Sequence, residues 1–307
     1  MKLISIVIPV YRNKGSISIT YNNIVKIFDN LQNKYKVEII FIDDGSDDGS
    51  LEEIKILNKE DPKVRFVSFT RNFGQHNATV AGYRIASGDS IITLSADLQD
   101  PTDLIPDVLS KWEKGSEIVI CYRNAREDKF LSRLFSKITY SILRVSYKNL
   151  PSGGFDYFLM SRNVLNSVNS FGTKTKFLPG ELLWSGYSVE MIPYLRKKRT
   201  IGKSQYNFWK KFKLFVDIFL DASHLPIRLI IFSGLLIAIF GFIYAILVVI
   251  SWYQNNTPFS GYAPIIISIF IIGGINTIMI GILGEYIWRI YNELKNMPQY
   301  LIKEKSD

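Results

Sequence analysis

The chain has one cysteine and two histidines among its 307 residues. The single cysteine, Cys121, excludes an internal disulfide and is typical of a reducing compartment. We expect its side chain to be a small buried group on a strand. The histidines, His76 and His224, do not lie in a recognisable general-base arrangement. The sequence therefore does not indicate a reaction that depends on a histidine base.

Two common phosphate-binding motifs are also absent. No G-x-G-x-x-G follows the first predicted strand, and no G-x-x-x-x-G-K-[ST] occurs in the chain. Neither a dinucleotide-binding fold nor a P-loop is supported. Any phosphate site must therefore be built from other residues.

Charged residues and histidine are absent from Leu229 through Gly284. Inside this block, Leu229 to Tyr253 gives 25 uncharged residues and Tyr262 to Gly284 gives 23. A helix needs roughly 20 apolar residues to cross the hydrocarbon core of a bilayer. The sequence therefore predicts two transmembrane helices, at 227–253 and 262–288, joined by a short non-cytoplasmic loop at 254–261.

Basic residues are concentrated just before this block. The formal net charge is +9, and eight Lys or Arg lie between Glu190 and Asp217 without any acid. Aromatic residues interleave with the later ones, which is typical of a helix in the lipid headgroup layer. We expect 201–226 to be a juxtamembrane amphipathic helix; a nucleic-acid groove is the competing interpretation and is disfavoured by the adjacent spans. The residues expected at the membrane surface are Lys210, Lys211 and Lys213.

The positions of the basic residues also predict the topology. They flank the predicted spans at Arg228 on one side and at Arg289 and Lys295 on the other. By the positive-inside rule, the N-terminal region and the tail at 289–307 are cytoplasmic and the protein is a multi-pass plasma-membrane protein. Glycines in the second span would allow close helix packing, which favours a homo-oligomer. They are Gly273, Gly274, Gly281 and Gly284.

The first 200 residues alternate between strand and helix patterns. Short apolar runs rich in β-branched residues, each followed by a helical pattern, predict a mostly parallel sheet covered by helices, and so an α/β domain at 1–200. The predicted strands are Leu3–Val10, Val37–Ile42, Val64–Phe69, Ile91–Leu94, Glu117–Cys121 and, further along the chain, Phe155–Met160.

Polar segments follow the strands at their carboxyl ends, where ligands bind in such sheets. Asp97 and Gln99 follow the fourth strand and could coordinate a hard divalent cation that also binds a diphosphate. The alternative is that Asp97 and Asp100 are turn and helix-cap residues. For Asp43 and Asp44 the two interpretations are a polar turn and a carboxylate that accepts hydrogen bonds from a nucleotide base or ribose.

Several motifs in fixed order carry a resemblance to a known family. They are Ile8-Pro9-Val-Tyr11, Ile42-Asp-Asp44-Gly-Ser46, Arg71-Asn-Phe-Gly74, Ala96-Asp97-Leu-Gln99-Asp-Pro101, Gly202-Lys203-Ser204 and Leu283-Gly-Glu285-Tyr-Ile-Trp-Arg289-Ile-Tyr291. The chain resembles polyprenyl-phosphate glycosyltransferases of the dolichol-phosphate mannose synthase and bactoprenol glucosyltransferase type. These are inverting enzymes of glycosyltransferase family 2 with a GT-A fold. The resemblance covers essentially the whole chain.

The resemblance implies a nucleotide-sugar donor, a polyprenyl-phosphate acceptor such as undecaprenyl phosphate, and a product in which the sugar is β-linked to the lipid phosphate. It implies that Asp97 and Gln99 bind Mg²⁺ or Mn²⁺ and that Asp97 and Arg123 are catalytic. The residues implied in nucleotide-sugar binding are Pro9, Tyr11, Ile42, Asp44, Ala96, Arg199 and Lys203. Nucleic acid is not an implied partner.

The sequence departs from the family pattern at three positions. Ser95 stands where the family has the first Asp of Asp-x-Asp-x-Gln, so a hydroxyl, water or donor phosphate would complete the cation shell. Asn13 replaces a glutamate, and Gln205 replaces a lysine for which Lys203 is a substitute.

Three classes of function stay open. Besides transfer to a lipid phosphate, these are a family 2 enzyme with a hydroxyl acceptor and a non-catalytic scaffold. The hydroxyl-acceptor enzyme would need a carboxylate base, for which Glu181 is the candidate, and usually a Q-x-x-R-W motif, which is absent. Glu181 could equally be a satisfied buried acid.

Overall fold

The computed structural model describes most of the chain in two compact units, Met1–Asp221 with Pro298–Asp307, and Ala222–Met297. Each unit is considered by itself. The residues described are 1–31, 33–123, 149–151, 154–170, 178–195, 225–254, 263–295 and 297–306, with 141, 144 and 147.

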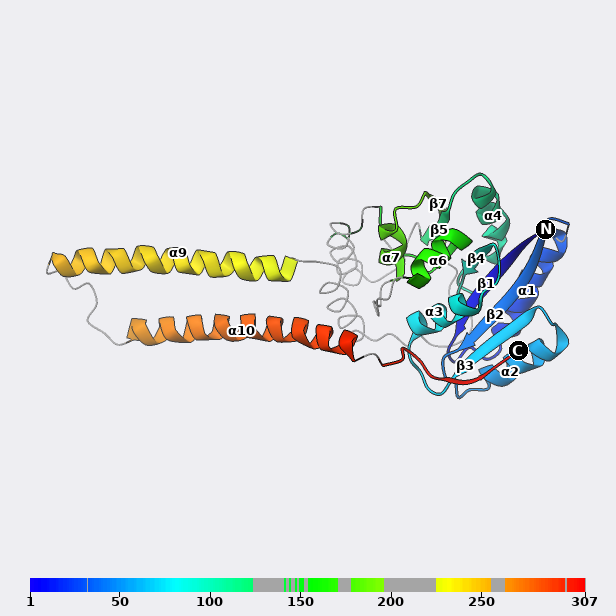
Figure 1. Ribbon diagram of the computed structural model, residues 1–307, viewed down its shortest axis with the longest axis horizontal. Coiled ribbons are helices and arrows are strands. Elements are labelled where there is room, and N and C mark those ends of the chain that lie inside the picture. Colours follow the sequence, from blue (N-terminus) through cyan, green and yellow to red (C-terminus); the bar gives the residue numbers. More distant parts are fainter. Residues whose placement is uncertain are drawn as a thin grey trace. The chain divides into compact units, whose positions relative to one another are not determined.

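The first unit is built on an 8-stranded sheet in the order β7-β5-β6-β4-β1-β2-β3-β8 (Figure 1). Its strands are β1 Lys2–Val10, β2 Tyr35–Asp43, β3 Val64–Phe69, β4 Ser90–Thr93, β5 Ile118–Arg123, β6 Tyr157–Ser161, β7 Val189–Tyr194 and β8 Ile302–Lys305. The pairs β1–β2, β1–β4, β2–β3 and β5–β7 are parallel. The pairs β3–β8, β4–β6 and β5–β6 are antiparallel. The predicted α/β class with a mostly parallel sheet is confirmed.

Helices cover both faces of this sheet. The helices α1, α2 and α4 pack on one face, and α3 and α6 pack on the other (Figure 1). The described helices of this unit are α1 Ile17–Leu31, α2 Ser50–Glu60, α3 Gln75–Ile85, α4 Ile105–Glu113 with the 3₁₀ turn Thr102–Leu104 before it, α6 Arg162–Ser170 and α7 Leu178–Trp184. A Cβ on Gly82 of α3 would lie 2.3 Å from Val7 Cγ1, so this helix packs directly against β1.

All six predicted strands are present, with bounds that match or are shifted by at most two residues. The sequence pattern does not predict β7 and β8, which form the two edges of the sheet. Their side chains are only partly buried, and β7 carries Glu190 and Pro193, so neither strand shows a continuous apolar run. The tail at 289–307 thus contributes a strand, β8, that was not predicted from the sequence.

The second unit consists of α9, Leu225–Tyr253, and α10, Ala263–Leu294. Large apolar side chains are exposed on both helices, for example Phe240 and Ile280. By length and composition, one stretch of the described helices could cross a bilayer, Ile271–Asn292 in α10, and α9 carries a shorter apolar stretch, Phe232–Tyr244. The two predicted spans therefore both fall on helices, and their insertion stays a prediction.

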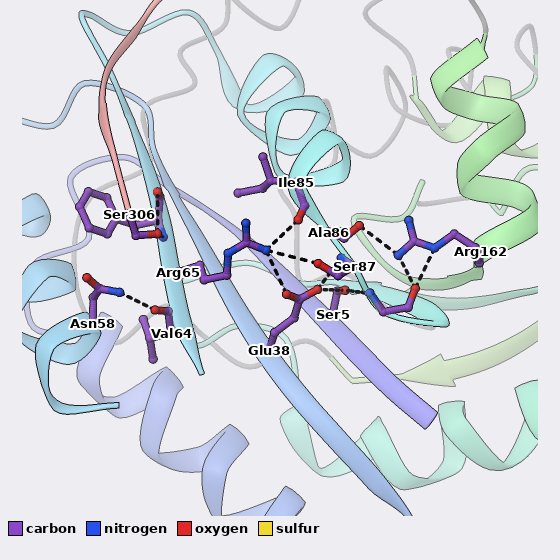
Figure 2. A network of polar contacts seen from close by, with 12 residues as sticks. Ser5, Glu38, Asn58, Val64, Arg65, Ile85, Ala86, Ser87, Arg162 and Ser306 are labelled. Carbon is purple, nitrogen blue, oxygen red and sulfur yellow. Dashed lines mark hydrogen bonds and ion pairs between the residues drawn. The ribbon is translucent and has the colours of Figure 1, made fainter. Parts of the chain in front are cut away.

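A buried carboxylate fixes the amino-terminal edge of the parallel strands. Glu38 of β2 accepts hydrogen bonds from the Ser5 hydroxyl, from the Ser87 amide at 2.6 Å and from Arg65 Nη1 at 3.2 Å (Figure 2). Arg65 also donates to the Ile85 carbonyl at 2.9 Å, and so satisfies the C-terminal end of α3. The network joins β1, β2, β3 and α3.

We predict that Glu38→Ala lowers the melting temperature of the purified protein markedly. Removal of the carboxylate leaves the buried Ser5 hydroxyl and the Ser87 amide without their acceptor, which costs about 1–3 kcal/mol. The partly exposed Arg65 also loses its ion-pair partner. The matched control is Glu190→Ala, because Glu190 forms an exposed ion pair with Lys111 at 3.0 Å, and such pairs contribute at most about 1 kcal/mol. Equal shifts in the two variants would contradict the structural role of Glu38.

Candidate active site

Parallel pairing brings the predicted site residues to one edge of the sheet. Pro9 of β1 pairs with Ile42 of β2, and β4 pairs with the other side of β1. The chain then leaves these strands at Tyr11, Asp44 and Ser95, so segments far apart in the sequence meet at adjacent strand ends. Backbone bonds fix two of these exits: Asp44 N donates to Val10 O at 2.8 Å and Leu94 N donates to Val7 O at 3.3 Å.

Asp44 is almost fully buried and binds the loop after β3. Its two carboxylate oxygens accept hydrogen bonds from Phe73 N at 2.6 Å and from Gly74 N at 2.9 Å. Burial raises the pKa of Asp44 to about 6, although these two backbone bonds act in the opposite direction. A carboxylate has about four acceptor positions, so Asp44 retains capacity for a ligand N–H or O–H.

The neighbouring loops pack too closely for a side chain at Gly45. This residue has φ +68°, and a Cβ on it would lie 2.4 Å from the Arg71 carbonyl carbon. Only glycine adopts this conformation without strain and leaves room for that approach. The adjacent Asp43 carboxylate accepts from Ser68 Oγ at 2.8 Å and from Ser46 N at 3.1 Å. Asp43 therefore does form a local turn bond.

Ser95 links two buried carboxylates beyond β4. Its hydroxyl lies 2.9 Å from Asp97 Oδ1 and is also hydrogen-bonded to Asp100 Oδ2, and its amide donates to Asp100 at 3.0 Å. Gln99 N donates to Asp97 Oδ1 at 3.1 Å, so Asp97 does form a local turn. Leu98 between them has φ 61°, a left-handed conformation that is rare for a non-glycine residue.

Asp100 belongs to a second polar cluster that reaches β7. Its Oδ1 accepts from the Tyr194 hydroxyl at 2.9 Å, and burial raises its pKa while the bonds from Ser95 and Tyr194 act against that rise. The following 3₁₀ turn begins after Pro101 without a side-chain cap, so the cap interpretation of Asp100 is wrong. Arg123, the last residue of β5, is buried and donates to Asp156 Oδ2 at 2.7 Å.

A family model for "Glycosyl transferase family 2" matches residues 5–168, which contain all of these strand ends except that of β7. The chain belongs to glycosyl transferase family 2. Its relatives agree over nearly the full length. A bactoprenol glucosyl transferase derived from the SfII prophage of Shigella flexneri is 37% identical over 303 residues, which are 98% of this chain and 97% of the relative. The resemblance drawn from the motifs is confirmed.

Other known proteins give the same family and fold. The putative glycosyltransferase CsbB of Bacillus subtilis is 34% identical over 305 residues, covering 99% of this chain and 92% of that protein. The crystal structure of mannosyl-3-phosphoglycerate synthase from Rubrobacter xylanophilus superposes with a TM-score of 0.53 at 14% identity, covering 74% of each chain. At this identity the structural likeness supports the fold alone, a GT-A-like α/β domain.

The residues of this family 2 domain fit a divalent cation. The Asp97 carboxylate and the Gln99 amide are hard oxygen donors of the kind that Mg²⁺ and Mn²⁺ prefer, and Ser95 adds a hydroxyl. Within the described ranges no group of three or more His, Cys, Asp or Glu side chains forms a metal site. A cation held here would therefore need oxygen ligands from water or a bound phosphate.

Arg199, Lys203, Lys210, Lys211, Lys213 and nearly all of 201–226 lie outside the described residues, as does most of 254–261. Two residues of the site were not predicted from the sequence. Tyr194 contacts Asp100, and Asp156 contacts Arg123. Tyr194 ends a strand immediately before the basic segment, but that strand had no recognisable pattern.

We predict that Ser95→Asp, which restores the residue usual in the family, destabilises this protein more than Ser95→Ala does. The substitution places a third carboxylate beside Asp97 and Asp100, both buried, and removes the hydroxyl donor between them. Thermal melting of the two variants and of the wild type tests this. If Ser95→Asp is as stable as the wild type, the interpretation of Ser95 as a neutral donor between carboxylates is wrong.

We predict that the KM for a nucleotide-sugar donor rises as the pH falls through about 6. Asp44, whose pKa burial raises to about 6, loses its charge in that range and accepts fewer hydrogen bonds. An intact nucleotide sugar does not titrate there, so it is the appropriate ligand. Asp44→Asn should bind more weakly and show no inflection near this pH; an unchanged inflection in this variant would assign it to another group.

Proposed function

We propose that this protein is a membrane-bound inverting glycosyltransferase. It transfers one sugar from a nucleotide sugar, a UDP-sugar, to undecaprenyl phosphate and produces a β-linked polyprenyl-phosphate sugar for modification of cell-envelope glycans. The observation that carries the proposal is the meeting of Asp44, Asp97 and Gln99 at adjacent strand ends in a chain whose 36–37% identical relatives are named bactoprenol glucosyl transferases.

In this proposal the donor-site residues contact different parts of the nucleotide sugar. Pro9, Tyr11 and Ile42 lie at the ends of β1 and β2 and line the nucleotide, and Asp44 accepts hydrogen bonds from its base or ribose. Ala96 lies beside the diphosphate. Arg123 and, from the part of the chain outside the described residues, Arg199 and Lys203 contact the donor or its phosphates.

Asp97 and Gln99 would hold Mg²⁺ or Mn²⁺ together with the donor diphosphate. Such a cation neutralises the charge that develops on a leaving nucleoside diphosphate. Ser95 orients Asp97 by its hydrogen bond at 2.9 Å, and Asp100 in turn holds Ser95. Arg123, kept in place by Asp156 at 2.7 Å, supplies a second positive charge near this edge of the sheet.

A lipid phosphate needs no dedicated general base, because it is already ionised at neutral pH. The proposed reaction is therefore consistent with a sequence in which neither histidine lies in a recognisable general-base arrangement. Glu181 of α7 is the candidate base of the alternative function, transfer to a hydroxyl acceptor on a glycolipid or polysaccharide.

The sheet itself supports the proposed topology. Strand β8 follows α10 in the chain and pairs with β3, so these two strands lie on the same side of any membrane. Between β7 and β8 the chain must then cross an even number of times. If α10 crosses the bilayer, a second crossing is needed, and α9 is the other apolar helix of the described residues. This agrees with the charge pattern that predicts both termini in the cytoplasm.

The experiment that tests the proposal is incubation of membranes containing the protein with labelled nucleotide sugars and undecaprenyl phosphate. A lipid product that mild acid cleaves is the expected result, since sugar-phosphate esters of this kind are acid-labile and glycosides are not. An acid-stable product would favour the hydroxyl-acceptor alternative. Absence of turnover with every donor would favour a non-catalytic scaffold.

We predict that Asp97→Ala reduces kcat at least about 10²-fold while the protein still inserts and binds detergent micelles normally. Glu181→Gln should retain much of the wild-type rate, because a phosphate acceptor needs no base. Steady-state kinetics on both purified variants measures the effect. Near-normal rates for Asp97→Ala would remove the cation role, and complete loss in a folded Glu181→Gln would support the alternative.

We predict opposite labelling of two introduced cysteines in intact cells. Because Cys121 is buried and is the chain's single cysteine, it can be replaced by serine to give a clean background. A membrane-impermeant maleimide should then react with Asn256→Cys in the loop between the helices and not with Lys303→Cys in β8. Labelling of Lys303→Cys would contradict the topology.

A further inference from the structure

The segment after α10 returns to the sheet and packs beside the loop that binds Asp44. Seven residues separate Leu294 of α10 from Ile302 of β8. The segment Pro298–Ser306, hereafter the C-terminal clasp, runs along β3 at the edge of the first unit (Figure 1). Its place in the fold is therefore next to the candidate active site.

Backbone bonds hold the C-terminal clasp along β3 from Phe66 to Thr70. Thr70 N donates to Leu301 O at 3.0 Å, and Ser306 N donates to Phe66 O at 3.0 Å. Phe66 N donates to Ser306 Oγ at 2.9 Å (Figure 2). An ion pair between Lys55 and Glu304 at 2.8 Å ties the clasp to α2.

Tyr300 connects the clasp to the loop at Arg71–Gly74. Its ring stacks on Phe69 with centroids 4.7 Å apart and planes at 15°, and its hydroxyl accepts from Arg84 Nη1 at 3.1 Å. Phe69 in turn meets Phe73 edge-to-face at 5.8 Å and 88°. Such aromatic pairs favour one relative orientation of the rings.

Phe73 completes the connection to the donor site. Its amide and that of Gly74 are the two donors to the Asp44 carboxylate, and its ring lies 4.2 Å beneath the Arg71 guanidinium. Contacts thus run from Tyr300 through Phe69 and Phe73 to Asp44. A loop held only by its own backbone would leave Asp44 free to reorient.

We infer that Tyr300 is a positioning residue for nucleotide binding, which acts through Phe69 and Phe73 to hold the loop amides against Asp44. The identity of the ligand rests on the proposed function, whereas the contacts between these residues do not depend on it. It also means that the part of the chain after α10 contributes to the support of the donor site.

The test compares Tyr300→Ala with Leu301→Ala in the full-length protein. Leu301 is the matched control because it lies in the same clasp with its side chain 52% exposed, and alanine there keeps the backbone bond to Thr70. Hydrogen–deuterium exchange of the Phe73 and Gly74 amides should accelerate in Tyr300→Ala and not in Leu301→Ala. The Kd for UDP should rise about fivefold in Tyr300→Ala alone, as expected for one lost aromatic contact.

Two further variants keep the inference testable. Tyr300→Phe retains the ring stack, so its amide exchange rates and its Kd for UDP should be close to those of the wild type. Tyr300→Leu retains an apolar side chain without the stack, and it replaces Tyr300→Ala if that variant is not folded. Unchanged exchange at Phe73 and Gly74 in a folded Tyr300→Ala would overturn the inference. If the wild type binds no UDP, the proposed donor fails, and the exchange measurement still decides the role of Tyr300.

Discussion

Parallel pairing of β1 with both β2 and β4 is the constraint on which the candidate site depends. Because β1 lies between the other two, their carboxyl ends open at one edge, and the residues that follow each strand must meet there. The buried network around Glu38 fixes the opposite ends of the same strands (Figure 2). The sheet therefore determines which segments meet at the site, and the loop contacts then orient the carboxylates.

The carboxylates at this edge are kept apart by neutral donors. Asp44 is bound by backbone amides, and Asp97 and Asp100 are separated by the Ser95 hydroxyl and satisfied further by Gln99 N and Tyr194. Buried charges persist only when such bonds compensate their lost hydration. Ser95, which departs from the family's usual aspartate, is thereby explained as a residue that supports its neighbours.

Much of the fold and part of the site were predictable from the sequence. Six strands were predictable because strands buried on both faces appear in the sequence as apolar runs. Asp44 and Asp97 were identified because each follows such a run. The edge strands β7 and β8 were not, because half-exposed strands such as Ile302–Lys305 lack that signal. Tyr194 and Tyr300 could not be predicted as site residues either. Their contacts join segments that are distant in the sequence, and such contacts leave no local sequence pattern.

The central claim is that the edge shared by β1, β2 and β4 binds the activated sugar donor. The most direct measurement is an experimental structure of the protein in a lipid nanodisc with a nucleotide sugar and Mn²⁺. The account predicts the cation about 2.0–2.4 Å from an Asp97 oxygen and the base or ribose within hydrogen-bond distance of Asp44. A nucleotide bound elsewhere, with the Asp97 carboxylate turned away from it, would contradict the account.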